Sequence, residues 1–186
     1  MDKSKAREIA RAALARMSGE ERRQADEAIC EYILSVCESV GGSVCIYNPL
    51  PDEADVSAAV RQMIAAGKRV YMPVMRGDDI MLVKADKKSK FALGRWGIKE
   101  PQGEMLMPQD TRIDVCITPL VAFTSKGGRV GRGKGCYDRF FAVCPCIKAG
   151  AAYAGAYVKG VRMQEHDIPL DLIITQAGVK KAEELL

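Results

Sequence analysis

Helical segments and short apolar, strand-like segments alternate along this chain, and this alternation limits its fold more than any other feature. Apolar residues recur at helical spacing in residues 3–17, 18–40 and 56–66, which predicts helices there. Ser18 followed three residues later by Glu21 is typical of the capping box that begins a helix. Apolar and β-branched runs predict strands at 44–47, 69–74, 80–83, 114–118, 149–153 and 172–175.

The order of these segments predicts an α/β fold, a three-layer open sheet covered by helices on both faces. The strand at 44–47, the helix and the strand at 69–74 form one β-α-β unit, whereas the turn at 76–79 before residues 80–83 predicts an antiparallel addition. A polar, lysine-rich connection follows. The 186 residues are enough to bury a core, so we expect a single domain over residues 1–186.

Charge and composition exclude several classes of protein. The 28 basic and 24 acidic side chains leave a net charge of +4, which is too mild for a dedicated nucleic-acid-binding domain and favours a small anionic ligand. No apolar run reaches the roughly 20 residues that span a bilayer, and residues 1–8 lack a signal-peptide core, so we expect a cytoplasmic protein with no membrane partner. The seven cysteines lack C-x-x-C spacing, which favours reduced thiols over a metal site. We expect a monomer.

The segment 129–139 carries the strongest functional signal. Gly131, Gly133 and Gly135 alternate there with Arg132 and Lys134. Glycine has no Cβ and adopts positive φ easily, so an anion can approach the backbone N–H groups closely while the two cations add charge. A predicted helix over 137–143 follows, and its N-terminus also favours phosphate.

This glycine loop matches no standard nucleotide-binding motif. Gly128, Gly133 and Lys134 have the spacing of a Walker A loop, but Gly135 stands where a Ser or Thr hydroxyl should bind magnesium. The G-x-G-x-G pattern also differs from the G-x-G-x-x-G of dinucleotide-binding folds. A solvated surface loop, or an RGG-like patch for RNA, therefore stays open on composition alone.

Polar clusters follow predicted strands at 48–53 and 118–139, and a third, at 165–167, lies in the loop before the strand at 172–175. Ligands of open α/β sheets bind beyond the carboxyl ends of the strands, so these clusters could converge on one site. Ordinary turn chemistry is the alternative, since Pro, Asn, Asp and Gly are common in loops.

Taken together, these segments resemble the 5-formyltetrahydrofolate cyclo-ligase family, also called 5,10-methenyltetrahydrofolate synthetase. The resemblance covers nearly the whole chain and depends on motifs in order: Lys3 and Arg7, then 52–53, 97–101, 129–138 and 166–171. The chain departs from the family pattern at Cys136, where the first of two tyrosines is usual, while Tyr137 is retained.

The resemblance implies a fold similar to the ribose-phosphate isomerase and coenzyme A transferase group. It also implies ATP and Mg²⁺ as cofactors and 5-formyltetrahydrofolate as substrate. In the reaction that it implies, the formyl oxygen is phosphorylated, N10 attacks the activated carbon and phosphate leaves, yielding 5,10-methenyltetrahydrofolate. Positioning and charge neutralisation would supply most of the catalysis.

The resemblance also implies residue roles, of which the catalytic ones fall to Arg132, Lys134 and Asp138. Magnesium would be held by Asp138 and Asp167, since this ion prefers carboxylate oxygens. ATP would be bound by Lys3, Arg7, Arg129, Val130, Gly131, Arg132, Gly133, Lys134, Gly135, Cys136 and Tyr137. The folate would be bound by Asn48, Glu53, Trp96, Arg132, Gly133, Lys134, Gly135 and Cys136.

Each of these residues also has a purely structural interpretation. Lys3 and Arg7 could form a solvated helix face, and Asp138 could be a first-turn acid favoured by the helix dipole. Glu53 could end a turn, and Trp96 could pack in a core or hairpin. Two other functions stay open: a phosphate- or RNA-binding module without ATP turnover, and a sugar-phosphate enzyme of the same fold.

Overall fold

The computed structural model describes residues 1–94 and 97–182. Its helices are α1 (Lys3–Leu14), α2 (Gly19–Val40), α3 (Ser57–Ala65) and α4 (Cys136–Val143). Its strands are β1 (Ser43–Ile46), β2 (Arg69–Arg76), β3 (Asp79–Ala85), β4 (Phe91–Leu93), β5 (Lys99–Pro101), β6 (Val115–Pro119), β7 (Ala122–Phe123), β8 (Arg129–Val130), β9 (Ile147–Ala151), β10 (Leu172–Thr175) and β11 (Gly178–Lys181).

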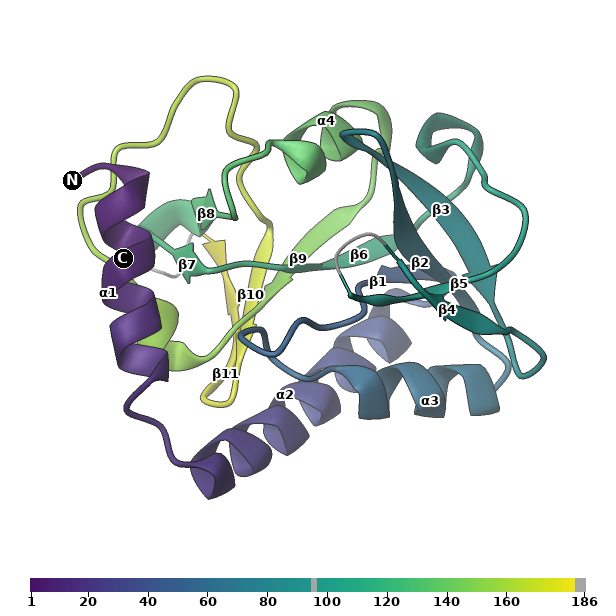
Figure 1. Ribbon diagram of the computed structural model, residues 1–186, viewed down its shortest axis with the longest axis horizontal. Coiled ribbons are helices and arrows are strands. Elements are labelled where there is room, and N and C mark those ends of the chain that lie inside the picture. The colour runs from purple at the N-terminus through teal and green to yellow at the C-terminus, as the bar shows by residue number, and fades with distance from the viewer. Residues whose placement is uncertain (95–96, 183–186) are drawn as a thin grey trace.

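A seven-stranded sheet forms the centre of the fold, in the order β11-β10-β9-β6-β1-β2-β3 (Figure 1). Strands β10, β9, β6, β1 and β2 pair in parallel, whereas β11 and β3 pair antiparallel at the two edges. The β-α-β unit and the antiparallel addition predicted from the sequence are both confirmed. Because β1 lies beside β6 and β6 beside β9, the loops after these strands emerge at one edge of the sheet.

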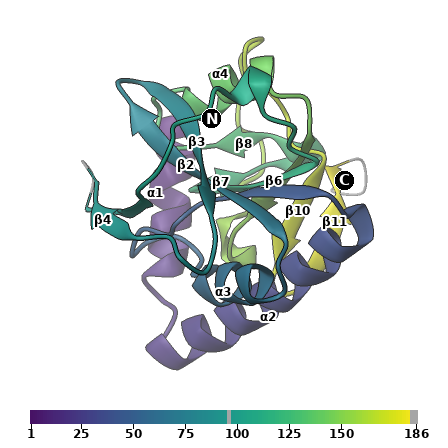
Figure 2. The same ribbon diagram turned by 90° about the vertical axis from the view of Figure 1, so that its right-hand side faces the viewer.

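Helices cover both faces of the sheet, as Figure 2 shows most clearly for α2 and α3 on one side and α4 on the other. Ile29 and Ile33 of α2 and Met63 of α3 are fully buried in one apolar core. On the opposite face, α1 and α4 contribute to a second core with Ala6 and Phe140. The predicted α/β sheet with helices over both faces is therefore confirmed.

Local sequence signals account well for the start of each N-terminal helix. The capping box of α2 forms as predicted, because the Ser18 hydroxyl accepts from the Glu21 N–H at 3.2 Å and the Glu21 carboxylate accepts from the Ser18 N–H at 2.7 Å. Asp2 caps α1 by accepting from the Lys5 N–H at 2.8 Å. Helix α1 ends at Leu14, earlier than the predicted residue 17.

Three features of the fold are absent from the sequence interpretation. One is the two-stranded sheet of β7 and β8, which are only two residues long each. The lysine-rich connection after β3 contains a small hairpin, β4–β5, and β11 adds an antiparallel strand after β10. Strands β4 and β11 are short and their side chains are largely exposed, so the alternation of apolar and polar residues that signals a strand is missing. Trp96, a predicted folate contact, lies outside the described residues.

Candidate active site

A large cavity of about 1610 Å³ opens beside the carboxyl ends of β1 and β6. Residues from α1, the loops after β1 and β6, the glycine loop, α4 and the segment 162–168 line it, so the polar clusters do converge. The lining includes Lys3, Arg7, Asn48, Glu53, Arg129, Gly131, Arg132, Gly133, Lys134, Gly135, Cys136, Tyr137, Asp138 and Asp167. Val130 is fully buried in the core beneath them, and its side chain does not face the cavity.

The glycines of the loop lie against guanidinium groups. A Cβ added at Gly131 would come within 2.6 Å of Arg129 Nη1, and one at Gly133 would come within 3.2 Å of Arg7 Nη2. Arg7 Nε also donates to the Gly131 carbonyl oxygen at 2.7 Å. Gly133 and Gly135 have φ of +100° and +65°, which L side chains rarely adopt. The glycines of this loop therefore serve two purposes: they leave room for the arginine side chains, and they allow the backbone to adopt positive φ.

Arg129 is the most deeply buried cation of this wall. Its side chain is 6% exposed, donates to Asp138 Oδ2 at 2.9 Å and lies over the Tyr137 ring at 5.4 Å. Among the described residues, Arg129 Nε is the single buried side-chain nitrogen or oxygen without a hydrogen-bond partner. A buried donor left unsatisfied on a cavity wall fits an anionic ligand group, because such donors are normally paired.

Helix α4 begins directly at the cavity. Gly135 precedes it in the left-handed conformation, and no side chain caps its first N–H groups. Cys136 and Tyr137 form its first turn together with Asp138. The free N–H groups of a helix start and its dipole favour a negative ligand here.

Two carboxylates occupy the same wall. The Ile168 N–H donates to Asp138 Oδ1 at 3.2 Å, which brings the neighbouring Asp167 close to Asp138. Asp167 accepts from Lys3 and, at 2.6 Å, from the Gln164 N–H. Partial burial favours a higher pKa for Asp167, but these hydrogen bonds outweigh it and lower the pKa below its usual value.

The two carboxylates fit a magnesium ion only as part of its coordination shell. Within residues 1–94 and 97–182, no cluster of three His, Cys, Asp or Glu side chains could hold a metal. Mg²⁺ commonly keeps several waters and binds through one or two carboxylates plus phosphate oxygens. Asp138 and Asp167 suit that kind of site, in which a nucleotide completes the coordination.

Glu53 lies on another wall and is nearly buried, with its side chain 8% exposed. Its Oε2 accepts from the Leu50 N–H at 2.9 Å, and its Oε1 accepts from Arg132 Nε at 3.3 Å. Burial raises the pKa of the Glu53 carboxyl and outweighs the opposing effects of these two partners. Arg132, which the family resemblance assigns to ATP, also forms an ion pair with Asp52, so it connects the glycine loop to this wall.

Apolar residues that the sequence analysis did not single out complete the cavity. They are Leu50, Pro73, Met75, Ile80, Ile98 and Leu120. Strand alternation placed Pro73 and Met75 on one face of β2, but only the sheet shows that this face borders the cavity. Asn48 donates to the carbonyl oxygen of Lys99 and so joins the β4–β5 hairpin to this side. Arg162, from the segment 162–168, is a further cation on the lining.

The chain is thus an α/β protein with a mainly parallel sheet and a partly cationic cavity at the carboxyl edge, the place where open α/β sheets bind their ligands. Residues 1–176 match the model of the 5-formyltetrahydrofolate cyclo-ligase family. The chain belongs to this family.

Known relatives agree with that match. The chain is 32% identical to a 5-formyltetrahydrofolate cyclo-ligase of Escherichia coli over 145 residues, 74% of this chain and 79% of that protein. It is 28% identical to a probable 5-formyltetrahydrofolate cyclo-ligase of Schizosaccharomyces pombe over 166 residues, 79% of this chain and 81% of the other. These alignments cover most of both chains.

Solved structures resemble the fold over almost its whole length. The 5,10-methenyltetrahydrofolate synthetase of Aquifex aeolicus superimposes with a TM-score of 0.83 at 29% identity, covering 98% of this chain and 93% of that one. The synthetase of Mycoplasma pneumoniae, at 23% identity and a TM-score of 0.76, shows the same fold over 95% of this chain and 99% of that one. No helix in the described part of the chain has the length and apolarity to cross a bilayer.

Proposed function

We propose that this protein converts 5-formyltetrahydrofolate to 5,10-methenyltetrahydrofolate with consumption of ATP. The observation that carries the proposal is the convergence of the family's motif residues, from separate parts of the chain, on one cavity. That cavity has a cationic wall around the glycine loop and apolar walls from β2 and β3. It therefore suits a phosphorylated ligand and a ring system together.

The cationic wall would bind ATP. Arg129 offers an unsatisfied buried Nε, the start of α4 offers uncapped N–H groups, and Lys134 lies on the same lining. Arg7 holds the Gly131 carbonyl oxygen and so keeps the loop in shape. When bound, ATP supplies the phosphoryl group that activates the formyl oxygen, and Mg²⁺ neutralises phosphate charge. Asp138 and Asp167 would hold that ion.

Glu53 and the apolar residues would bind the folate. A buried carboxylate can accept hydrogen bonds from pterin N–H groups, while Leu50, Met75 and Ile80 would contact the ring faces. The Arg132 side chain extends from the glycine loop to this wall, where it would orient the formyl group toward the phosphates. The chain's contribution to catalysis is thus to hold two substrates in line and to exclude water from the reacting atoms.

We also propose that the fold belongs with the ribose-phosphate isomerase and coenzyme A transferase group, and that the protein is a cytoplasmic monomer. The parallel sheet with helices on both faces supports that grouping.

The deciding experiment follows the absorbance of the methenyl product from 5-formyltetrahydrofolate. We expect product only when ATP and Mg²⁺ are both present. No product together with salt-dependent binding of single-stranded RNA would favour the RNA-binding alternative. Turnover of a sugar phosphate without ATP would favour the other enzyme class.

Glu53→Gln tests the folate wall in particular. The amide presents one acceptor and one donor, so KM for 5-formyltetrahydrofolate should rise roughly 10- to 150-fold, while ATP affinity stays the same. Because burial raises the pKa of Glu53, folate affinity of the parent protein should weaken on acidification from a higher pH than for an exposed glutamate. The variant should lack this pH dependence. Unchanged folate kinetics in a folded variant would remove Glu53 from the site.

A further inference from the structure

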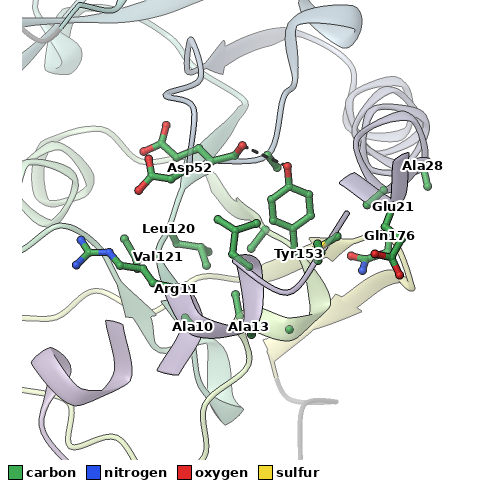
Figure 3. Close-up of a pocket in the computed structure, with 18 of the residues that line it drawn as sticks. Ala10, Arg11, Ala13, Glu21, Ala28, Asp52, Leu120, Val121, Tyr153 and Gln176 are labelled. Atoms are coloured by element: carbon green, nitrogen blue, oxygen red, sulfur yellow. Dashed lines mark hydrogen bonds between the residues drawn. The ribbon is translucent and has the colours of Figure 1, made fainter. Parts of the chain in front are cut away.

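The segment 51–55, which carries Glu53, lies between two cavities. On one side it borders the large cavity, and on the other it borders a smaller one of about 540 Å³ between α1 and α2. Figure 3 shows this smaller cavity, with Asp52 and Tyr153 on its lining. Ala54 packs into the apolar core, whereas Asp52 is partly exposed and Glu53 faces the large cavity, so packing holds only part of the segment. Hydrogen bonds to its backbone supply the rest of the support.

Side chains from outside the segment supply such bonds. The Tyr47 hydroxyl donates to the Ala54 carbonyl oxygen at 2.8 Å. Three further side chains form one group that contacts the same segment. Arg22 of α2 donates to the Pro51 carbonyl oxygen at 2.7 Å. Asp26, one turn further along α2, accepts from the Asp55 N–H at 2.9 Å. The hydroxyl of Tyr153, just after β9, lies 3.4 Å from the Glu53 carbonyl oxygen, the contact drawn as a dashed line in Figure 3. Each contacts a different backbone group of the segment.

The three side chains also hold one another. The Tyr153 hydroxyl donates to Asp26 Oδ1 at 2.7 Å, and Arg22 Nη2 donates to that hydroxyl at 3.3 Å. The Arg22 guanidinium lies over the Tyr153 ring at 5.5 Å. Burial raises the pKa of Tyr153 to about 12, so the hydroxyl keeps its proton and remains a donor at neutral pH. The group therefore forms a closed support behind the wall that carries Glu53.

We infer that Arg22, Asp26 and Tyr153 are positioning residues for the folate wall, which set the place of the Glu53 carboxylate in the large cavity without touching the substrate. This inference rests on the proposed function, in which Glu53 accepts hydrogen bonds from the folate. If so, affinity for the folate depends partly on residues that do not line the large cavity. Loss of the support should lower folate affinity and leave the nucleotide wall unaffected.

The test compares Asp26→Ala with Asp26→Asn and with Glu27→Ala, an exposed position on the same helix that pairs with Arg23. Asp26→Ala removes the acceptor of two hydrogen bonds, so KM for 5-formyltetrahydrofolate should rise on the order of tenfold with KM for ATP unchanged. Asp26→Asn keeps an acceptor oxygen and should restore most of the affinity. Glu27→Ala should resemble the parent protein. Equal rises in both KM values, or no rise in either, would overturn the inference.

A double-mutant cycle separates positioning from general stability. In a Glu53→Gln background, Asp26→Ala should add little to KM, because the carboxylate that it positions is already gone. Independent, additive effects would contradict the positioning role, as would a lowered melting temperature without a change in folate KM. If the parent protein binds no folate, the proposed function itself fails. If Glu53→Gln weakens folate binding and Asp26→Ala does not, only the present inference fails.

Discussion

The two walls of the large cavity are held in place in opposite ways. On the glycine-loop wall, arginine side chains fill space that glycines leave open, and Arg7 binds the loop through the Gly131 carbonyl oxygen. On the wall of residues 51–55, the backbone lies between two cavities and is held by side chains from α2 and from the residues after β9. The first wall is thus held by side chains that also line the cavity, and the second by side chains that lie on its far side from the cavity.

This difference predicts where each wall is sensitive. The glycine-loop wall contains a buried cation with an unsatisfied donor, so small changes of volume there should disturb the charge that faces the ligand. The other wall presents one nearly buried carboxylate, whose position depends on contacts outside the cavity. Substitutions should therefore affect ATP and folate binding separately.

The largest effect should come from Asp138→Asn. It removes the charge paired with the nearly buried Arg129, and breaking such a pair costs about 3–5 kcal/mol. We expect turnover to fall about 100-fold or more, with a raised magnesium requirement if Asp138 holds the ion. Steady-state rates over a magnesium titration measure both quantities. Asp79→Asn, whose pair with Arg139 is on the surface, is the control. Normal turnover at limiting magnesium would leave Asp138 only a structural role.

Lys134→Ala should affect the nucleotide alone. A charged hydrogen bond to phosphate contributes about 1.5–3 kcal/mol, so ATP affinity measured by calorimetry should fall roughly 10- to 150-fold while folate binding is retained. Lys5→Ala, on the exposed face of α1 where Lys5 pairs with Glu8, should bind ATP like the parent. Equal ATP affinity of the Lys134→Ala protein and its parent would rule out the phosphate contact.

Gly131→Ala tests whether packing beneath the loop sets the cationic wall. The new methyl group would lie 2.6 Å from Arg129 Nη1, so the nearly buried guanidinium must shift. We expect ATP affinity to fall on the order of tenfold with folate affinity unchanged. Gly19→Ala, with no atom within 4 Å of its new Cβ, is the matched control. A Gly131→Ala protein with parental ATP affinity would show that the guanidinium position is not critical.

The smallest effect should come from Asp52→Asn. Asp52 and Arg132 are about equally exposed, at 41% and 40% of their side chains, and exposed pairs contribute only about 0.2–1 kcal/mol. Folate KM should therefore change less than about fivefold, well below the effect of Glu53→Gln. A rise in folate KM of more than tenfold would mean that Asp52 itself contacts the substrate. In that case Asp52, and not Glu53, would be the carboxylate that binds the folate.

Much of the architecture was predictable from local sequence. Helical periodicity and the Ser18–Glu21 capping box predicted α2, and apolar runs predicted the parallel strands. The β4–β5 hairpin and β11 were not predictable in this way, because β4 and β11 are short and largely exposed and leave no periodic pattern. For the site, position after the strands predicted that Glu53 and the glycine loop would share one cavity.

By itself, the sequence determined which residue types stand at the ends of the strands, since turn and helix signals act between neighbours in the chain. Only the tertiary structure decided which charges meet. Arg132 contacts Glu53 across 79 positions and Lys3 contacts Asp167 across 164, because the sheet order and the placement of α1 bring these segments together. It also decided that glycines face guanidinium groups and that the wall of residues 51–55 lies between two cavities. Such contacts depend on distances through space, which spacing along the chain does not specify.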